Sequence, residues 1–176
     1  MNDGGTDNGG TGNGGTGEGG PDNGGKDTAG VIAPPPVIYL AFLLAGFGAD
    51  ALWPAAILSQ GPRYAAGTAA IALGLALGFA AVRQFRRHNT SFKPHEPSTA
   101  LITGGPYRYS RNPIYLALFL VYAGIGIAAD SPWTLALLVP LLVVLHYGVI
   151  IREERYLERK FADAYRRYKS TTRRWL

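Results

Sequence analysis

The 176-residue sequence contains no cysteine, and this absence removes several kinds of chemistry at once. A disulfide, a thiolate nucleophile and a cysteine-ligated metal are all excluded. Charged residues are also scarce, at 16%, whereas apolar residues make up 47%. The first 30 residues show neither a basic stretch nor an apolar core, so we expect no cleavable signal peptide. Any chemistry must therefore come from the few charged and aromatic side chains.

The N-terminal region consists of glycine and small polar residues. Gly-Gly pairs recur between residues 4 and 25, and no side chain among them is large enough to form a core. We predict a disordered Gly-rich tail over 1–36, ending in the stiff spacer Pro34-Pro35-Pro36. The alternative, a phosphate-binding glycine loop, requires a strand before it and a helix after it, and the sequence predicts neither.

The rest of the chain alternates long apolar runs with short polar connections. A transmembrane helix needs roughly 17–25 predominantly apolar residues. Four segments meet or approach this length: 37–59, 64–82, 113–129 and 133–151. The sequence therefore predicts an all-α, polytopic membrane helical bundle of about four transmembrane helices, forming one domain over 37–176.

A further helix is predicted over 152–169. Leu157, Phe161, Tyr165 and Tyr168 follow helical spacing and make one apolar stripe among arginines. This amphipathic C-terminal helix has two compatible interpretations. It lies on the inner leaflet through its basic residues, or it covers a cytoplasmic pocket.

Basic residues define the predicted orientation. They cluster in the 83–113 connection and after residue 151, whereas the other two connections hold Arg63 alone. The positive-inside rule places both basic regions, and with four spans both termini, in the cytoplasm of an inner or plasma membrane. A basic chain can also bind nucleic acid, but bases placed between apolar runs are better explained by topology, so we expect no nucleic-acid partner.

The segment 105–115 concentrates cationic and aromatic groups at the start of the third apolar run. Asn112-Pro113 suits a helix start, with asparagine as N-cap and proline at the first helical position. A helix N-terminus binds anions, and Arg108 and Arg111 lie just before it. The segment therefore indicates a site for a carboxylate or phosphate, or arginines that contact lipid head groups only.

A pair of acids, Glu153-Glu154, ends the fourth apolar run. Glu154 shares a helical face with Leu157 and Phe161, so we expect its carboxylate to point inward and to need a partner. That partner is Arg108 or Arg111, or a ligand ammonium or ribose.

Three other features inside the apolar runs have structural and functional alternatives. His146, seven residues before Glu153, is predicted on the same face, either as a site residue or as a neutral histidine bonded to a neighbouring helix. Asp50 is treated in the same way, as an interfacial acid or a functional one. Gly124 and Gly126 are predicted to let helices approach closely. His88 and His95 lack metal-ligand spacing, so we predict no metal site.

Two motifs together resemble a known family. The run 103–115, followed by 152–157 and then by Phe161, Tyr165 and Tyr168, resembles the isoprenylcysteine carboxyl methyltransferases, which group with the membrane phospholipid methyltransferases. The resemblance implies an integral membrane methyltransferase that uses S-adenosylmethionine without a Rossmann domain. It also implies a cytosolic cofactor site and a lipophilic acceptor, a small molecule or a lipid, that enters from the bilayer.

The resemblance assigns site residues by position. Arg111, Asn112, Pro113 and Tyr115 match an Arg-His-Pro-x-Tyr cofactor motif, Glu153 and Glu154 match its acidic pair, and the closing C-terminal part is matched by Phe161, Tyr165, Tyr168 and Arg173. The predicted cofactor-binding residues are Tyr107, Arg108, Arg111, Asn112, Pro113, Tyr115, His146, Glu153, Glu154, Tyr165 and Tyr168. The catalytic candidates are Arg111, Asn112, Glu154 and Arg173.

One residue departs from the motif, because Asn112 stands where the family has histidine. Asparagine can hydrogen-bond a cofactor but cannot take up a proton, so a general base at this position is unsupported. Two other functions stay open: an NADPH-dependent membrane reductase of the sterol-reductase type, and a non-catalytic membrane subunit. The acceptor atom, whether oxygen, nitrogen or sulfur, is not predicted.

Overall fold

The computed structural model describes residues 29–87 and 100–176, and every regular element in these ranges is a helix. The predicted disorder of residues 1–28 and the predicted loop histidines His88 and His95 lie outside the described residues.

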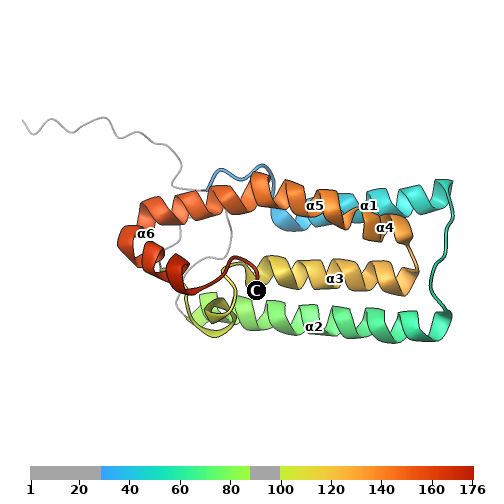
Figure 1. Cartoon of the computed structure of the whole chain (residues 1–176), viewed down its shortest axis with the longest axis horizontal. Coiled ribbons are helices and arrows are strands. Elements are labelled where there is room, and N and C mark those ends of the chain that lie inside the picture. The colour runs from blue at the N-terminus through green and yellow to red at the C-terminus, as the bar shows by residue number, and fades with distance from the viewer. Residues whose placement is uncertain (1–28, 88–99) are drawn as a thin grey trace, which may run out of the picture.

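The helices form an elongated bundle, shown in Figure 1. α2 and α3 lie side by side, and α1 lies along a rod made of α4, α5, η2 and α6. The elements are α1 (Pro35–Leu52), α2 (Gln60–Arg87), the 3₁₀ turn η1 (Gly105–Arg108), α3 (Pro113–Ala129), α4 (Pro132–Ala136), α5 (Leu138–Leu145), the π-helical η2 (His146–Ile150) and α6 (Ile151–Thr171).

The bundle has the character of a membrane protein. Among the described residues, three helices are long and apolar enough to cross a membrane, namely Pro35–Leu52, Gln60–Arg87 and Pro132–Thr171, and α3 is a shorter apolar helix. Large apolar side chains such as Leu44, Leu73 and Phe79 are exposed on the outside, where lipid rather than water suits them. The predicted all-α membrane bundle is confirmed.

Glycines bring α2 and α3 into backbone contact. A Cβ atom added to Gly124 would lie 2.7 Å from the Gly67 carbonyl oxygen, and one added to Gly67 would lie 2.7 Å from the Gly124 carbonyl oxygen. Gly126 similarly faces the Leu135 and Thr134 side chains at the start of the rod. The close approach predicted for Gly124 and Gly126 is confirmed.

Asp50 and Asp130, at the end of the bundle opposite η1, have structural roles. In the α3–α4 turn the Ser131 hydroxyl accepts a hydrogen bond from the Thr134 N–H at 3.0 Å and so caps α4. The Asp130 carboxylate accepts two backbone N–H groups of the α1–α2 connection and pairs with Arg63 at 3.1 Å. Asp50 accepts a hydrogen bond from the Ser131 hydroxyl. This end of the bundle is therefore held together by buried polar contacts.

Two predicted boundaries differ from the structure. The first apolar segment was predicted to be helical to residue 59, but α1 ends at Leu52, because Trp53 precedes Pro54 and a residue before proline disfavours helical backbone. The tail was predicted to reach residue 36, but residues 29–34 pack against η2. Ala29 and Val31 are buried, and the Ile32 N–H donates to the Gly148 carbonyl oxygen at 3.3 Å.

The path of α6 distinguishes the two interpretations of the C-terminal helix. Its first half continues the direction of α5, so that half does not lie flat in the bilayer plane. At Ala162 the backbone adopts φ 41° and ψ −117°, and the helix turns back towards η1. Lys169 and Glu158, 3.2 Å apart, join the two halves. The structure therefore favours the interpretation in which this helix covers a pocket.

Candidate functional site

Polar residues from distant parts of the chain meet at the end of the bundle that carries α6. The N-terminus of α3 supplies Arg111 and Asn112, and the start of α6 supplies Glu153 and Glu154. The extended segment 172–176, which we call the C-terminal strap, supplies Arg174. These five residues form what we call the polar site.

Glu154 lies at the centre of the polar site, with a residue exposure of 6%. The Arg174 guanidinium donates to both of its carboxylate oxygens, from Nε to Oε1 at 3.0 Å and from Nη2 to Oε2 at 2.7 Å. Arg111 Nη1 lies 3.2 Å from Oε1. Arg108 and Arg111 were the protein partners predicted for Glu154, and Arg111 is the one that contacts it. Arg174 is a second partner that was not predicted.

Arg111 is a buried cation with unused hydrogen-bonding capacity. Only 9% of its side chain is exposed, and it forms an ion pair with Glu154, yet its Nε and Nη1 groups have no hydrogen-bond acceptor among the described residues. Buried donors are normally satisfied, so each exception requires an explanation. The unfilled donors would suit an anionic ligand group.

Glu153 has different surroundings from its neighbour. The Tyr115 hydroxyl donates to Glu153 Oε1 at 2.7 Å. Burial raises the pKa of the Glu153 carboxyl to about 7, and the Tyr115 hydrogen bond only partly opposes that rise. Glu153 is therefore close to half-protonated near neutral pH.

Asn112 is placed as predicted but does not cap α3. It occupies the position before Pro113, yet its side chain makes no capping hydrogen bond. Its Nδ2 instead donates to the Arg174 carbonyl oxygen at 3.0 Å, a group that the Ser110 hydroxyl also contacts at 3.2 Å. Asn112 and Pro113 thus start α3 at the predicted positions, but the side-chain cap predicted for Asn112 is not formed, because the strap takes its amide.

Tyrosines from the returning half of α6 cover the polar site. Tyr165 is 1% exposed, and the Tyr168 hydroxyl donates to the Tyr107 carbonyl oxygen at 2.7 Å. Burial raises the pKa of Tyr165 to about 12 and also raises the pKa values of Tyr107 and Tyr168. All three rings therefore stay neutral and form an aromatic wall.

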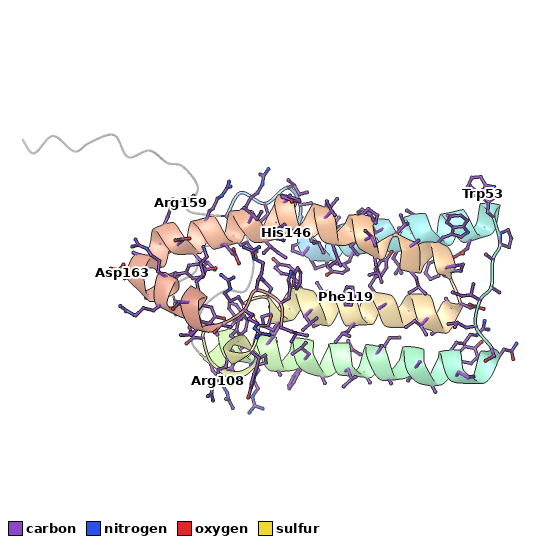
Figure 2. The ribbon with its side chains drawn as sticks, in the orientation of Figure 1. Trp53, Arg108, Phe119, His146, Arg159 and Asp163 are labelled. Atoms are coloured by element: carbon purple, nitrogen blue, oxygen red, sulfur yellow. The ribbon has the colours of Figure 1, made fainter. Side chains whose placement is uncertain are left out.

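Two predicted site arginines lie outside the polar site. Arg108 is exposed at the end of η1, because Tyr107 takes the inward position, and Figure 2 shows Arg108 at the edge of the molecule. Arg173 is also exposed, although its carbonyl oxygen accepts the Arg111 N–H at 2.9 Å. In an extended strap neighbouring side chains point to different sides, so Arg174 rather than Arg173 points inward.

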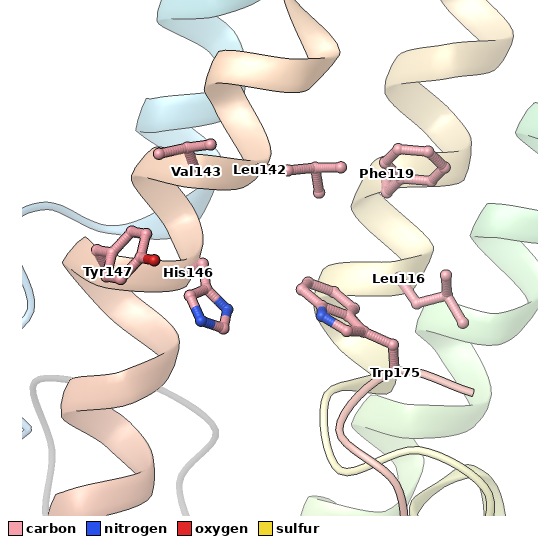
Figure 3. Close-up of a pocket in the computed structure, with 7 residues that line it drawn as sticks. All are labelled: Leu116, Phe119, Leu142, Val143, His146, Tyr147 and Trp175. Atoms are coloured by element: carbon pink, nitrogen blue, oxygen red, sulfur yellow. The ribbon is translucent and has the colours of Figure 1, made fainter.

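His146 lies in a separate apolar cleft between α3 and the α5–η2 rod, shown in Figure 3. The cleft has a volume of about 470 Å³. Its lining residues are Leu116, Phe119, Leu142, Val143, His146, Tyr147 and Trp175.

His146 and Glu153, which were predicted on one helical face, both lie towards α3. The Glu153 carboxylate accepts the Tyr115 hydroxyl, and His146 lines the cleft together with Leu116 and Phe119. The chain between them is not a regular α-helix, because η2 is a π-helix. Glu153 is not among the residues that line the cleft.

Sequence reasoning missed Arg174 and Trp175. No helical period extends to them, because α6 ends at Thr171 and the strap continues from it as extended chain. Their bulk and charge were visible in the sequence, but the turn at Ala162 that carries them back to α3 was not. Among the described residues, no group of three or more acids or histidines could hold a metal ion.

Comparison with known proteins bears on this geometry. The phospholipid methyltransferase family model matches residues 62–164, more than half of the chain. The chain is 39% identical over 67 residues to the nickel-cobalt-cadmium resistance protein NccN of Alcaligenes xylosoxydans xylosoxydans, covering 38% of this chain and 31% of that protein. It is 42% identical over 65 residues to an uncharacterized protein of Haemophilus influenzae, covering 36% of this chain and 100% of that protein.

The chain thus spans about a third of the length of NccN and the whole of the Haemophilus protein. No solved structure matches it. The family match begins in α2 and ends in α6, so it includes Arg111, Asn112, Glu153 and Glu154 but not the strap.

Proposed function

This chain belongs to the phospholipid methyltransferase family, and on that premise we propose that it transfers a methyl group from S-adenosylmethionine to a lipophilic acceptor in the membrane. When bound, this cofactor supplies an activated methyl group on a sulfonium. At the level of residues, we assign the polar site to the cofactor and the cleft to the acceptor.

The observation that carries the cofactor assignment is Arg111. Among the described residues its buried Nε has no acceptor, its Nη1 has only the ion pair with Glu154, and no side chain caps the adjacent N-terminus of α3. Together they offer a carboxylate a guanidinium beside a helix N-terminus. The α-carboxylate of an amino-acid cofactor has this chemistry.

The remaining polar-site groups complement the rest of such a cofactor. Glu153, at half-protonation near neutral pH, can accept hydrogen bonds from an ammonium or a ribose diol. The neutral rings of Tyr165 and Tyr168 offer faces for an adenine or a sulfonium. Glu154 is already satisfied by two arginines, so we assign it to positioning Arg111.

The apolar cleft suits the acceptor. It lies between α3 and the α5–η2 rod and is lined mostly by apolar side chains. The His146 imidazole in this lining can accept a proton, and the Tyr147 hydroxyl and the Trp175 N–H can also hydrogen-bond an acceptor head. Methyl transfer needs alignment and a dry pocket more than a strong base, which agrees with the absence of histidine at position 112.

The orientation follows from the charges. Arginines and lysines surround the polar site on α6 and the strap, so the positive-inside rule puts the site on the cytoplasmic side of an integral membrane protein. A soluble cofactor is available there.

Calorimetric titration of the purified protein with S-adenosylmethionine, and separately with NADPH, tests this function. We expect saturable binding of S-adenosylmethionine, weakened by Arg111→Ala about 10- to 100-fold, as for the loss of charge-assisted hydrogen bonds. Arg159→Ala is the matched control, because Arg159 is exposed on α6 (Figure 2) and should leave binding unchanged.

Saturable NADPH binding without S-adenosylmethionine binding would instead establish the reductase alternative. Binding of neither molecule would favour a non-catalytic subunit. Equal weakening by both arginine substitutions would remove Arg111 from the proposed cofactor site.

A further inference from the structure

Trp175 joins the two compartments of the molecule. Its indole lines the apolar cleft, while the preceding residue, Arg174, belongs to the polar site. Figure 3 shows the indole and the His146 imidazole pointing towards one another across the cleft. A molecule that enters the cleft from the lipid and moves towards the polar site meets this ring.

The position of Trp175 is fixed by its neighbour as well as by its own packing against the buried core. Arg174 is held through its side chain by both oxygens of Glu154 and through its carbonyl oxygen by Asn112 and Ser110. A strap anchored on both sides of Arg174 has little freedom to swing the next residue away. The indole is therefore a fixed wall of the cleft.

The other residues that line the cleft do not select the length of an occupant, so this selection falls to the wall formed by Trp175. Apart from His146 and Tyr147, the cleft is built from aliphatic side chains and Phe119, which hold an apolar chain without distinguishing its length. The Trp175 indole and the His146 imidazole face one another across the cleft, so the gap between them limits how far a longer or bulkier occupant can reach towards the polar site.

We propose that Trp175 is a specificity-determining residue, which closes the inner end of the cleft and limits the length of the apolar acceptor that fits. This inference rests on the proposed acceptor role of the cleft. It concerns a residue outside the family match, which ends at residue 164. Chains that share the matched region can therefore differ in acceptor size through the strap alone.

The test uses photoreactive diazirine analogues of geraniol, farnesol and geranylgeraniol, added to the full chain in lipid nanodiscs. The yield of crosslinks to the α3 peptide that carries Leu116 and Phe119 is measured by mass spectrometry for each analogue. We expect Trp175→Ala to raise the ratio of geranylgeranyl to geranyl crosslinking by roughly tenfold, the discrimination that a few methylenes give in an apolar pocket. Trp175→Phe should give a smaller rise.

Trp133→Ala is the matched control, since Trp133 lies at the opposite end of the bundle and its indole N–H contacts the Trp53 carbonyl oxygen. It should leave the ratio unchanged. S-Adenosylmethionine binding to each variant is measured in parallel, and a melting curve of each variant shows that it is folded.

The outcomes separate the two proposals. Cofactor binding with the same crosslinking ratio in wild type and Trp175→Ala overturns the role of Trp175 alone. Absence of crosslinks to α3 in every protein overturns it as well, because the cleft then takes no apolar chain. A shifted ratio without cofactor binding keeps Trp175 as the size limit and overturns the proposed methyl transfer.

Discussion

At the scale of single residues, the polar site contains two adjacent carboxylates with opposite surroundings. Glu154 pairs with Arg111 and Arg174, whereas Glu153 accepts the Tyr115 hydroxyl. Burial raises the pKa of Glu153, so this carboxyl responds to pH near neutrality.

The raised pKa of Glu153 predicts a pH-dependent stability. Its folded pKa of about 7 exceeds the ordinary value of 4.5, so the folded state binds this proton more tightly than the unfolded state. The stabilisation is complete below the unfolded value and is lost as pH rises through about 7. We expect the melting temperature of the ligand-free protein to fall over this interval.

Glu153→Gln provides the comparison, because glutamine keeps the shape and loses the titration. Melting curves collected across the interval in one detergent should show a flatter pH dependence for Glu153→Gln than for wild type. Identical slopes would mean that Glu153 titrates normally and is not desolvated.

At the scale of elements, the α2–α3 pair depends on backbone contact at glycine. Gly124→Ala would place a methyl group 2.7 Å from the Gly67 carbonyl oxygen and 2.9 Å from the Ile71 backbone nitrogen. Neither group can yield without moving a helix. We expect destabilisation of about 1–3 kcal/mol, typical of overpacking, measured by denaturant titration in mixed micelles.

Gly48→Ala is the control for this prediction. Gly48 also lies within a helix, but an added Cβ meets no atom within 4 Å. Alanine should there stabilise the protein by about 0.5–1 kcal/mol through helix propensity alone. Equal effects at both positions would contradict a tight α2–α3 contact.

The sequence predicted the elements better than their ends. Long apolar runs indicate burial in lipid, so the helices at 64–82, 113–129 and 133–151 were predicted from the sequence. What local pattern does not encode is a change of direction. The turn at Ala162 places a non-glycine residue at positive φ, which only tertiary contacts can enforce.

The same reason limited the prediction of the site. Arg111, Asn112, Glu153 and Glu154 were found because motif and helix position both pointed to them. Arg174 and Trp175 reach the site through the turn and the extended strap, so no periodicity marked them. The π turn that begins at His146 was not predicted, because it is not apparent in the order of apolar residues.

At the scale of the whole molecule, the absence of cysteine makes the proposed orientation directly measurable. Single cysteines are introduced at Ala55, exposed in the α1–α2 connection, and at Arg167, exposed on α6. With intact cells, a membrane-impermeant maleimide should label Ala55→Cys, and it should label Arg167→Cys only after permeabilisation. The reverse pattern would place the polar site on the outer side.

The short α3 has a consequence for the bilayer around the protein. Its 17 residues span about 25 Å at 1.5 Å per residue, less than the roughly 30 Å of a typical hydrocarbon layer. A helix that is too short is accommodated by thinning of the bilayer, by snorkelling of flanking residues or by oligomerisation, each at a modest cost per ångström of mismatch. If α3 spans the membrane, the activity proposed above should therefore depend on the acyl-chain length of the host lipids.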